Sequence, residues 1–359
     1  MPARDFVMLV SAAAGSGLRA EVAEGRRPCP EFLRLEGRGV ELLDWSRLVP
    51  AAGRRSPWTS IRHVIAALRR LDRFDAVFSD GEQVGVPLAL GMLARQMTTP
   101  HLMIGHHLTG RRKRFLLRTS RCHRGISRIL VHSRQQLEDA ERALGIPGDR
   151  LAFIPYHADA GFWSPGEEPE ERLIVSAGRE HRDYATLAAA VATLDAPVFV
   201  ADGSVHAPHA PHRAPAGWPA NVSSGFAGYP QLRNLFARAA VVVVPLVDND
   251  FQAGVTTILE AMAMAKPVIV TASRGQRDVV EDGVTGRLVP PADAESLREA
   301  ILSLLGSAAE RRRLGDNARQ AVLEGFSLEA YVSGLLGHLE AITAPRDSFR
   351  AATRRERTA

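Results

Sequence analysis

The sequence predicts an α/β protein made of two doubly wound domains, and three observations support this prediction. Short apolar segments alternate with helix-like segments along most of the chain, as in strands separated by helices. Val241–Val244 is a continuous β-branched run without polar alternation, as expected of a parallel strand covered on both faces. The length of 359 residues accommodates two domains of ordinary size.

The composition is that of a water-soluble globular protein, with 45% hydrophobic and 24% charged residues. No apolar run reaches the roughly 20 residues needed to cross a bilayer, and Met1–Arg26 lacks a signal-peptide pattern. We therefore expect a cytoplasmic protein. Two cysteines, Cys29 and Cys122, are too few for a disulfide framework or a four-cysteine metal site.

The net charge of +5 is carried almost wholly by arginine, and its distribution is uneven. From Gln83 to Leu137 there is no Asp or Glu. The basic residues of this stretch are Arg95, Arg111, Arg112, Lys113, Arg114, Arg118, Arg121, Arg124, Arg128 and Arg134. Such a local field attracts an anionic membrane, an anionic acceptor or nucleic acid.

Within this stretch, Thr109–Ser120 mixes four consecutive basic residues with Phe115, Leu116 and Leu117. Three interpretations stay open: a helix lying on an anionic membrane through Arg111–Arg118, the wall of a polar acceptor groove, or a solvated helix. If the membrane interpretation holds, the protein is peripheral at the inner membrane surface. Because aromatic residues for base stacking are not interleaved here, we expect no nucleic-acid partner.

The first half of the chain contains six apolar segments that read as strands. They are Phe6–Val10, Val40–Leu43, Asp75–Phe78, His101–Ile104, Ile129–Val131 and Leu151–Ile154. Helical patterns cover Leu18–Glu24 and Ile61–Leu71, and another begins near Val84. Open α/β sheets bind ligands beyond the carboxyl ends of their strands, so the residues that follow these strands are candidates for a site.

Five residues of the first half fit this criterion. Gly15 and Gly17 follow the first strand, where glycine lets the backbone approach a ligand, although the same pattern marks an ordinary turn. Asp80 and Glu82 follow the third strand and are candidates for acceptor contact or for capping the next helix. His106 follows the fourth strand, and a lone histidine there is by itself more often a packed or surface residue than a catalytic one.

The second half repeats the pattern after a proline-rich segment, Pro165–Pro169, which suggests a hinge near residue 160. Strands are predicted at Leu173–Ser176, Val198–Val200 and Val241–Val244, and helices at Gln231–Ala239, Ala294–Leu305, Ala308–Leu323 and Glu329–Ile342. Arg179 and Arg182 follow the first of these strands in a glycine turn. The histidines of His206–Trp218 lie among prolines without a regular pattern, so we expect an exposed loop there rather than a metal site.

Residues 240–289 carry the strongest chemical signal. The strand Val241–Val244 leads through a polar loop into a helix that Gly254 opens, and a helix start offers free N–H groups and a positive dipole end to a phosphate. Thr256, Thr257 and Glu260 share one face of that helix. Glu260 lies roughly 9 Å along the axis from Gly254, about the distance from a diphosphate to a ribose. A carboxylate suits a ribose diol because it accepts two hydrogen bonds, so the residues predict a nucleotide-diphosphate site.

The same residues resemble the donor-binding signature of retaining GT-B glycosyltransferases, glycosyltransferase family 4. The motifs that carry the resemblance are Gly254, Leu259–Ala263, Lys266–Ile269, Gly275, Asp282-Gly283 and Thr285–Val289. The resemblance implies a GT-B fold, with two facing Rossmann-like domains and a central cleft. It also implies transfer from a nucleotide sugar, which is a co-substrate, with no cofactor and no metal.

Roles for individual residues follow from this resemblance. Glu260 would hold the ribose, and the helix start at Gly254 and Val255, with Thr256 and Thr257, would hold the diphosphate. Arg179 and Arg182 would neutralise that diphosphate, the alternative being two solvated surface arginines. The remaining implied contacts are His106 to the donor sugar, Gly225 and Phe226 near the nucleobase, and the loop with Gly15 and Gly17 facing the donor phosphates or the acceptor.

Two features need separate interpretation. The family usually has a glutamate at the position of Gln252, and glutamine can hydrogen-bond to a sugar but carries no charge. Asp248-Asn249-Asp250 has the Asp-x-Asp form that holds a metal in a different glycosyltransferase fold, but the flanking motifs favour phosphate stabilisation by basic residues and helix dipoles.

The resulting prediction is a retaining, metal-independent, hexosyltransferase-like enzyme that moves a sugar to a hydroxyl acceptor, which would be a glycan, a lipid-linked molecule or a small molecule. Residues 1–160 would form the acceptor-side domain and 161–325 the nucleotide-sugar domain. Residues 326–345 would form a helix crossing back, and 346–359 a basic, disordered tail. Two alternatives stay open: a nucleotide-sugar 2-epimerase of the same fold, and a nucleotide-sugar-binding protein with weak catalysis, which Gln252 suggests.

Overall fold

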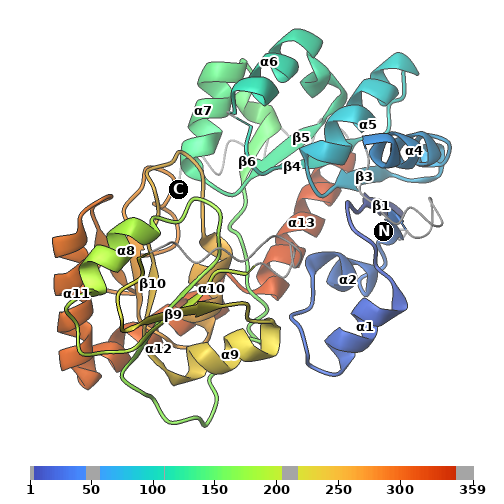
Figure 1. The fold of residues 1–359 in the computed structure, drawn as a ribbon. Coiled ribbons are helices and arrows are strands. Elements are labelled where there is room, and N and C mark those ends of the chain that lie inside the picture. Colours follow the sequence, from blue (N-terminus) through green and yellow to red (C-terminus); the bar gives the residue numbers. More distant parts are fainter. Residues whose placement is uncertain (1–3, 46–56, 109, 204–216, 345–359) are drawn as a thin grey trace.

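The computed structural model describes residues 4–45, 57–108, 110–203 and 217–344, and it contains two six-stranded sheets (Figure 1). The first has strand order β2-β1-β3-β4-β5-β6 and the second β12-β11-β10-β7-β8-β9. Every pair of neighbouring strands is parallel. The predicted fold class, two doubly wound α/β domains of GT-B type, is confirmed. The histidines at 206, 209 and 212 and the segment 346–359 lie outside the described residues.

The first sheet is built almost entirely from buried strands. They are β1 Phe6–Leu9, β2 Glu41–Leu43, β3 Ala76–Ser79, β4 His101–Gly105, β5 Arg128–Val131 and β6 Leu151–Phe153. The helices of this half are α1 Ser16–Ala23, α2 Glu31–Glu36, α4 Pro57–Leu68, α5 Glu82–Ala94, α6 Arg111–Ser120 and α7 Arg134–Leu144. The strands after β1 extend the sheet in opposite directions, so a topological switch point lies between β1 and β3.

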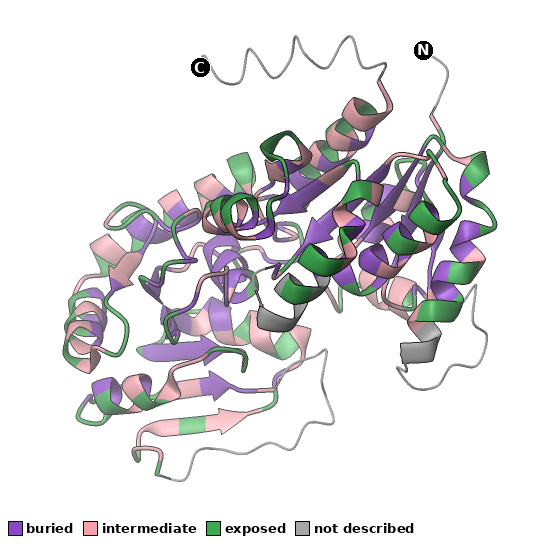
Figure 2. Cartoon of the chain, turned by 90° about the horizontal axis from the view of Figure 1, so that it is seen from above, coloured by how far each residue is buried: buried purple, intermediate pink, exposed green. Residues whose placement is uncertain are grey.

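The second sheet repeats this plan with its switch point between β7 and β10. Its strands are β7 Leu173–Ala177, β8 Val198–Ala201, β9 Val222–Gly225, β10 Ala239–Val244, β11 Val268–Thr271 and β12 Arg287–Val289. Its helices are α8 Tyr184–Val191, α9 Tyr229–Arg238, α10 Val255–Ala263, α11 Ala294–Gly306 and α12 Ala308–Gly325. Most of these strands are buried, whereas β9 has no buried residue, and the helices are partly exposed (Figure 2).

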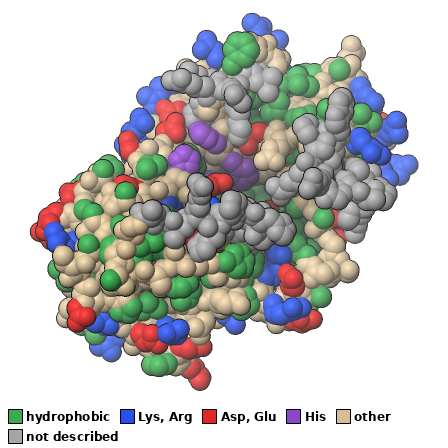
Figure 3. Space-filling model, viewed as in Figure 1, with side chains coloured by type: hydrophobic (Ala, Val, Ile, Leu, Met, Phe, Trp, Pro, Cys, Tyr) green, Lys and Arg blue, Asp and Glu red, His purple; other side chains and the backbone are tan. Residues whose placement is uncertain are grey.

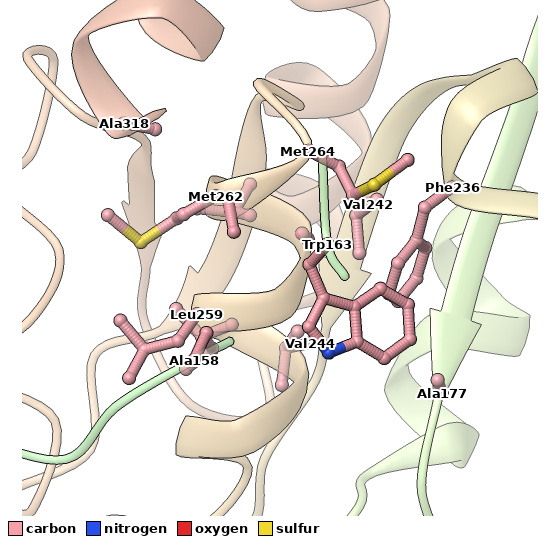
Figure 4. Close-up of a cluster of buried hydrophobic side chains, with 14 of the residues drawn as sticks. Ala158, Trp163, Ala177, Phe236, Val242, Val244, Leu259, Met262, Met264 and Ala318 are labelled. Carbon is pink, nitrogen blue, oxygen red and sulfur yellow. The ribbon is translucent and has the colours of Figure 1, made fainter. Parts of the chain in front are cut away.

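The core of the second domain includes a segment that arrives from the interdomain linker. Trp163 is 1% exposed and packs edge-on against Phe162 and at a tilt against Phe236. Figure 4 shows Trp163 among Val244, Met264 and Phe236, so a single indole fills the space between linker, sheet and helix. Burial of a side chain this large fixes where the chain enters the domain.

The last helix, α13 Leu328–Thr343, follows the second domain in sequence but packs on the first sheet. Its buried residues Tyr331, Val332 and Leu335 belong to the same apolar cluster as residues of β1 and β3. Figure 1 shows α13 running between the two halves of the molecule. No helix among the described residues combines the length and the apolar character required of a membrane span.

Side chains also connect the two domains across the cleft. Asp278 of the second domain accepts a hydrogen bond from the backbone N–H of Arg134 at 3.0 Å, at the start of α7. His107 of the first domain stacks on Phe251 of the second with ring centroids 4.7 Å apart. These contacts bring the carboxyl edges of the two sheets to face each other.

Candidate active site

A cleft of about 900 Å³ lies between the carboxyl ends of the two sheets. The first domain contributes His106, His107 and His132 to its walls, and Tyr156 comes from the linker. Most of the remaining wall comes from the loops after β7 and β10 and from α10. In Figure 3 the histidine side chains gather at the hollow between the two halves. The cleft therefore includes the switch point of the second sheet and faces the ends of β4 and β5 in the first.

The start of α10 opens directly onto this cleft. Gly254 is the N-cap residue with φ of 76°, and no side chain of the described residues caps the helix. A Cβ atom at Gly254 would lie 2.9 Å from Cγ1 of Val244 and 3.0 Å from Nη1 of Arg182. Position 254 therefore requires glycine both for its left-handed conformation and for its close approach to the guanidinium. Val255, Thr256 and Thr257 line the cleft beside it.

Arg182 is held against this helix start by three hydrogen bonds. Its Nε donates to the carbonyl of Ala177 at 2.9 Å, Nη1 donates to the carbonyl of Glu180 at 2.9 Å, and Nη2 donates to Oγ1 of Thr257 at 3.2 Å. Burial lowers the pKa of Arg182, but an arginine side chain stays charged at neutral pH. The result is a fixed positive charge at a helix N-terminus.

The glycine turn after β7 encloses the same guanidinium from the other side. Gly178 has φ of 97°, and a Cβ there would lie 2.4 Å from Nη2 of Arg182. The hydroxyl of Tyr184 donates to the carbonyl of Gly178 and holds the turn. Arg179, in the same turn, is exposed and lines the cleft. The two arginines named from the sequence thus lie in one wall.

Glu260 lies deeper in the cleft on the same helix. It is 7% exposed, and burial raises its pKa to about 8. Without a ligand the carboxyl group therefore keeps its proton at neutral pH. Thr256, Thr257 and Glu260 all line the cleft, as their shared helical face predicts.

Gln252 lines the cleft just before the helix start. It is 8% exposed, and its Oε1 is buried without a hydrogen-bond partner. Its Nε2 donates to Oδ2 of Asp278 at 3.5 Å. The neighbouring Phe251 lies between His107 and His181, with His181 edge-on at 4.8 Å. Gln252 thus presents a free acceptor atom from a position held by interdomain contacts.

On the first domain, His106 connects the cleft to the residues after β3. Its Nε2 lies 2.8 Å from the carbonyl oxygen of Asp80, to which it can donate. The carboxylate of Asp80 accepts from the backbone N–H of Ser11 at 2.6 Å. Glu82 lines neither this cleft nor the smaller cavity beside it, and its Oε1 accepts from the N–H of His107 at 2.9 Å. Glu82 therefore shapes the loop that carries the histidines.

The other residues named from the sequence lie at the margins. Gly15 is the N-cap of α1 and Gly17 lies in its first turn, and neither lines the cleft or the smaller cavity beside it. Gly225 ends β9, and Phe226 is 55% exposed beside Gly203, which lines the cleft. The part of the cleft nearest to Gly225 is lined by Gly203 and by residues two to seven positions after Gly225, which are Ala227, Tyr229 and Leu232.

The side chains of Asp248-Asn249-Asp250 turn to separate partners. Oδ1 of Asp248 accepts a hydrogen bond from the backbone N–H of Arg274. Oδ1 of Asp250 lies 3.8 Å from Nε2 of His107. Asn249 donates to the carbonyl of Val247 at 2.8 Å. These side chains fold the loop and link it across the cleft.

Sequence reasoning missed several cleft residues, among them His132 and Tyr156. His132 is 6% exposed, and its Nδ1 lies 3.1 Å from the carbonyl of Ile154. Burial lowers its pKa to about 3, so the ring is neutral, and its buried Nε2 has no partner. Both residues directly follow a strand or its extension, so the rule that singled out His106 would also have found them.

Comparison with known families matches both halves of the chain. Residues 2–157 match the glycosyl transferase 4-like domain, and residues 173–307 match glycosyl transferases group 1. The second match contains Arg179, Arg182, Gly254 and Glu260.

Curated relatives align over short segments. An MMP alpha-(1->4)-mannosyltransferase from Mycolicibacterium hassiacum is 37% identical over 101 residues, which is 28% of this chain and 24% of the relative. An alpha-D-kanosaminyltransferase from Streptomyces kanamyceticus is 28% identical over 114 residues, 32% of this chain and 29% of the relative. The chain thus matches less than a third of the length of these relatives.

Solved structures align over nearly the whole chain. Sucrose-phosphate synthase from Thermosynechococcus elongatus has a TM-score of 0.70 and 21% identity, covering 97% of this chain and 100% of that one. Anabaena Alr3699/HepE in complex with UDP and glucose has a TM-score of 0.68 and 14% identity, covering 94% and 100%. At these identities the likeness establishes the fold.

Proposed function

Because the chain belongs to the group 1 glycosyl transferases and has the GT-B fold, we propose that it moves a sugar from a nucleotide-diphosphate sugar to an acceptor hydroxyl with retention of configuration. The observation that carries the proposal is the arrangement of Arg182. Its guanidinium is enclosed by two glycine turns at an uncapped helix start, with the buried Glu260 farther along the same helix. This is a site for a diphosphate followed by a ribose.

The donor would lie along α10. Its diphosphate would accept hydrogen bonds from the first-turn N–H groups and from Arg182, with Arg179 at the rim. Its ribose would reach Glu260, and the base would lie near Gly203. One structural relative was crystallised with UDP and glucose, which supports a nucleotide-sugar donor.

Transfer would depend on charge stabilisation rather than on a protein nucleophile. As the sugar–phosphate bond breaks, negative charge grows on the departing diphosphate, and fixed positive groups stabilise it without reorganising. The leaving phosphate oxygen would take the acceptor proton, so the protein needs no carboxylate base. His106 and the free Oε1 of Gln252 would orient the sugar. We propose that the reaction needs no metal and no further cofactor.

The test is a panel of nucleotide sugars assayed by calorimetry and by product analysis. Transfer or donor hydrolysis without epimerisation is expected. A 2-epimerised donor sugar would support the epimerase, and tight binding without turnover would support the binding protein. Glu260→Ala should weaken nucleotide binding at least tenfold, and unchanged affinity would contradict the ribose assignment.

We also propose a cytoplasmic protein with a peripheral membrane contact through α6. Phe115 on this helix is 72% exposed, whereas Leu117 is 2% exposed. The side chains of Arg111–Arg114 lie outside the described residues. Sedimentation with anionic but not neutral liposomes is expected, and Phe115→Ser should reduce it. Equal sedimentation with both liposome types would contradict the electrostatic contact.

A further inference from the structure

A second, smaller cavity of about 140 Å³ lies beside the cleft in the first domain. It sits at the switch point between β1 and β3, lined by Ser11 after β1 and Asp80 after β3. His106 and Tyr156 line both cavities, so the two are neighbours across these side chains. A molecule held in the small cavity would have its other end in the cleft.

The polar groups of this cavity include two carboxyls, and its hydroxyls and ring nitrogens can accept hydrogen bonds. Glu31 and Asp80 both line it, and none of its lining residues is an arginine or lysine. Oδ1 of Asp80 is buried without a partner, because the two bonds from Ser11 go to Oδ2. Nδ1 of His157 is likewise buried and unpaired. An anionic ligand would be repelled here, whereas a cationic donor would find several partners.

An independent feature points to a ligand in the same cavity. Tyr331 of α13 is 6% exposed, lines the cavity, and its hydroxyl has no hydrogen-bond partner among the described residues. Its ring stacks on His157 with centroids 4.2 Å apart. The Tyr331 side chain is buried while its hydroxyl has no protein partner, so the hydroxyl is available to a polar group that enters the cavity.

The charge state of the cavity suits a cation. Burial, with a smaller effect of Asp80, raises the pKa of Glu31 to about 7, while its own backbone and His106 lower it. Burial also lowers the pKa of His157 to about 4, so that ring is neutral. Near neutral pH, a cation placed beside Glu31 would favour its carboxylate form.

We propose that this cavity binds a protonated amino group of the acceptor, and that the acceptor class is therefore a polyhydroxylated amine. Glu31 and Asp80 provide the counter-charge, and Tyr331 and His157 accept the remaining N–H bonds. The acceptor hydroxyl then extends past His106 into the cleft. This inference rests on the proposed glycosyl transfer, because it names the substrate class for that same site.

The test uses three sugars that share a ring and differ at one carbon: glucosamine, glucose and N-acetylglucosamine. Calorimetry on the full chain with UDP present is expected to show glucosamine binding at least tenfold more tightly than the other two. Glu31→Gln should reduce this preference to within twofold. Glu329→Gln, a matched change at a half-exposed glutamate of α13 that lines neither cavity, should leave it intact.

UDP affinity, measured on every variant, verifies that the fold is retained. The inference would be overturned if the three sugars bound with equal affinity or if none of them bound. It would also be overturned if the Glu31→Gln variant bound UDP and kept the full preference for glucosamine. If the amine preference is present but no nucleotide sugar is bound or consumed, the proposed function fails instead. The two failures are therefore distinguishable.

Discussion

Replacing Glu260 by glutamine changes how the stability of the protein depends on pH. Burial raises the pKa of Glu260 from 4.5 to about 8. Between these values the unfolded chain has released a proton that the native state keeps, so the free energy of unfolding falls as pH rises. Each pH unit in this window corresponds to about 1.4 kcal/mol. Wild type should therefore lose about 3 kcal/mol between about pH 5 and pH 7.5 through this one group.

Glutamine does not titrate, so Glu260→Gln should gain about 3 kcal/mol relative to wild type over the same interval. The assay is urea unfolding followed by tryptophan fluorescence, to which Trp163, buried in the same domain as Glu260, contributes. Glu324→Gln, an exposed position on α12, is the control and should show a difference independent of pH. The argument would be refuted if Glu260→Gln and wild type differed by the same free energy at both pH values, because the carboxyl would then be hydrated in the native state.

Three further substitutions test the donor side of the cleft. Arg182→Lys loses the three hydrogen bonds that the guanidinium donates to Ala177, Glu180 and Thr257. It should lower kcat for sugar transfer at least 100-fold in a UDP-release assay, and a change below threefold would contradict the role of Arg182. Gly254→Ala puts alanine in a left-handed conformation, which costs roughly 1 kcal/mol, and brings its Cβ to 2.9 Å from Cγ1 of Val244. The UDP affinity measured by calorimetry and the Tm should therefore both fall. Gln252→Glu places a second carboxylate beside Asp278, 3.5 Å away in wild type, and should lower Tm by about 2–4 °C; an unchanged Tm in thermal-shift measurements would show that the contact is weak.

The strands were predictable because burial on both faces leaves a strong compositional mark. Val241–Val244 lies within β10 Ala239–Val244, and every residue of that strand is buried. Helix ends were less predictable: the pattern indicated Ile61–Leu71, whereas α4 spans Pro57–Leu68. Apolar spacing identifies the packed face of a helix but not the residue at which its hydrogen bonds stop.

The candidate site was predictable where it is local in sequence, and Arg179, Arg182 and His106 were found because they follow strands and match the family's pattern. Gly254, Thr257 and Glu260 belong to one helix, so their shared face follows from the helical period. Glu31 and Tyr331 lie at opposite ends of the chain and meet because α13 returns to the first sheet. Glu31 belongs to the six-residue α2, which is too short to produce a periodic pattern, so nothing in the sequence indicated its place.

The two cavities differ in charge, and under the proposed function this difference would orient the reaction. In the cleft Arg182 stays charged while Glu260 is protonated, so the wall that would face the proposed diphosphate is positive before any ligand binds. On the first domain the small cavity is lined by Glu31 and Asp80 and by no arginine or lysine. A diphosphate is attracted to the first wall and repelled by the second, and an ammonium group has the opposite preference. The residues of one chain can thereby keep a donor and an acceptor from exchanging places, with His106 at the boundary where the sugar would be transferred.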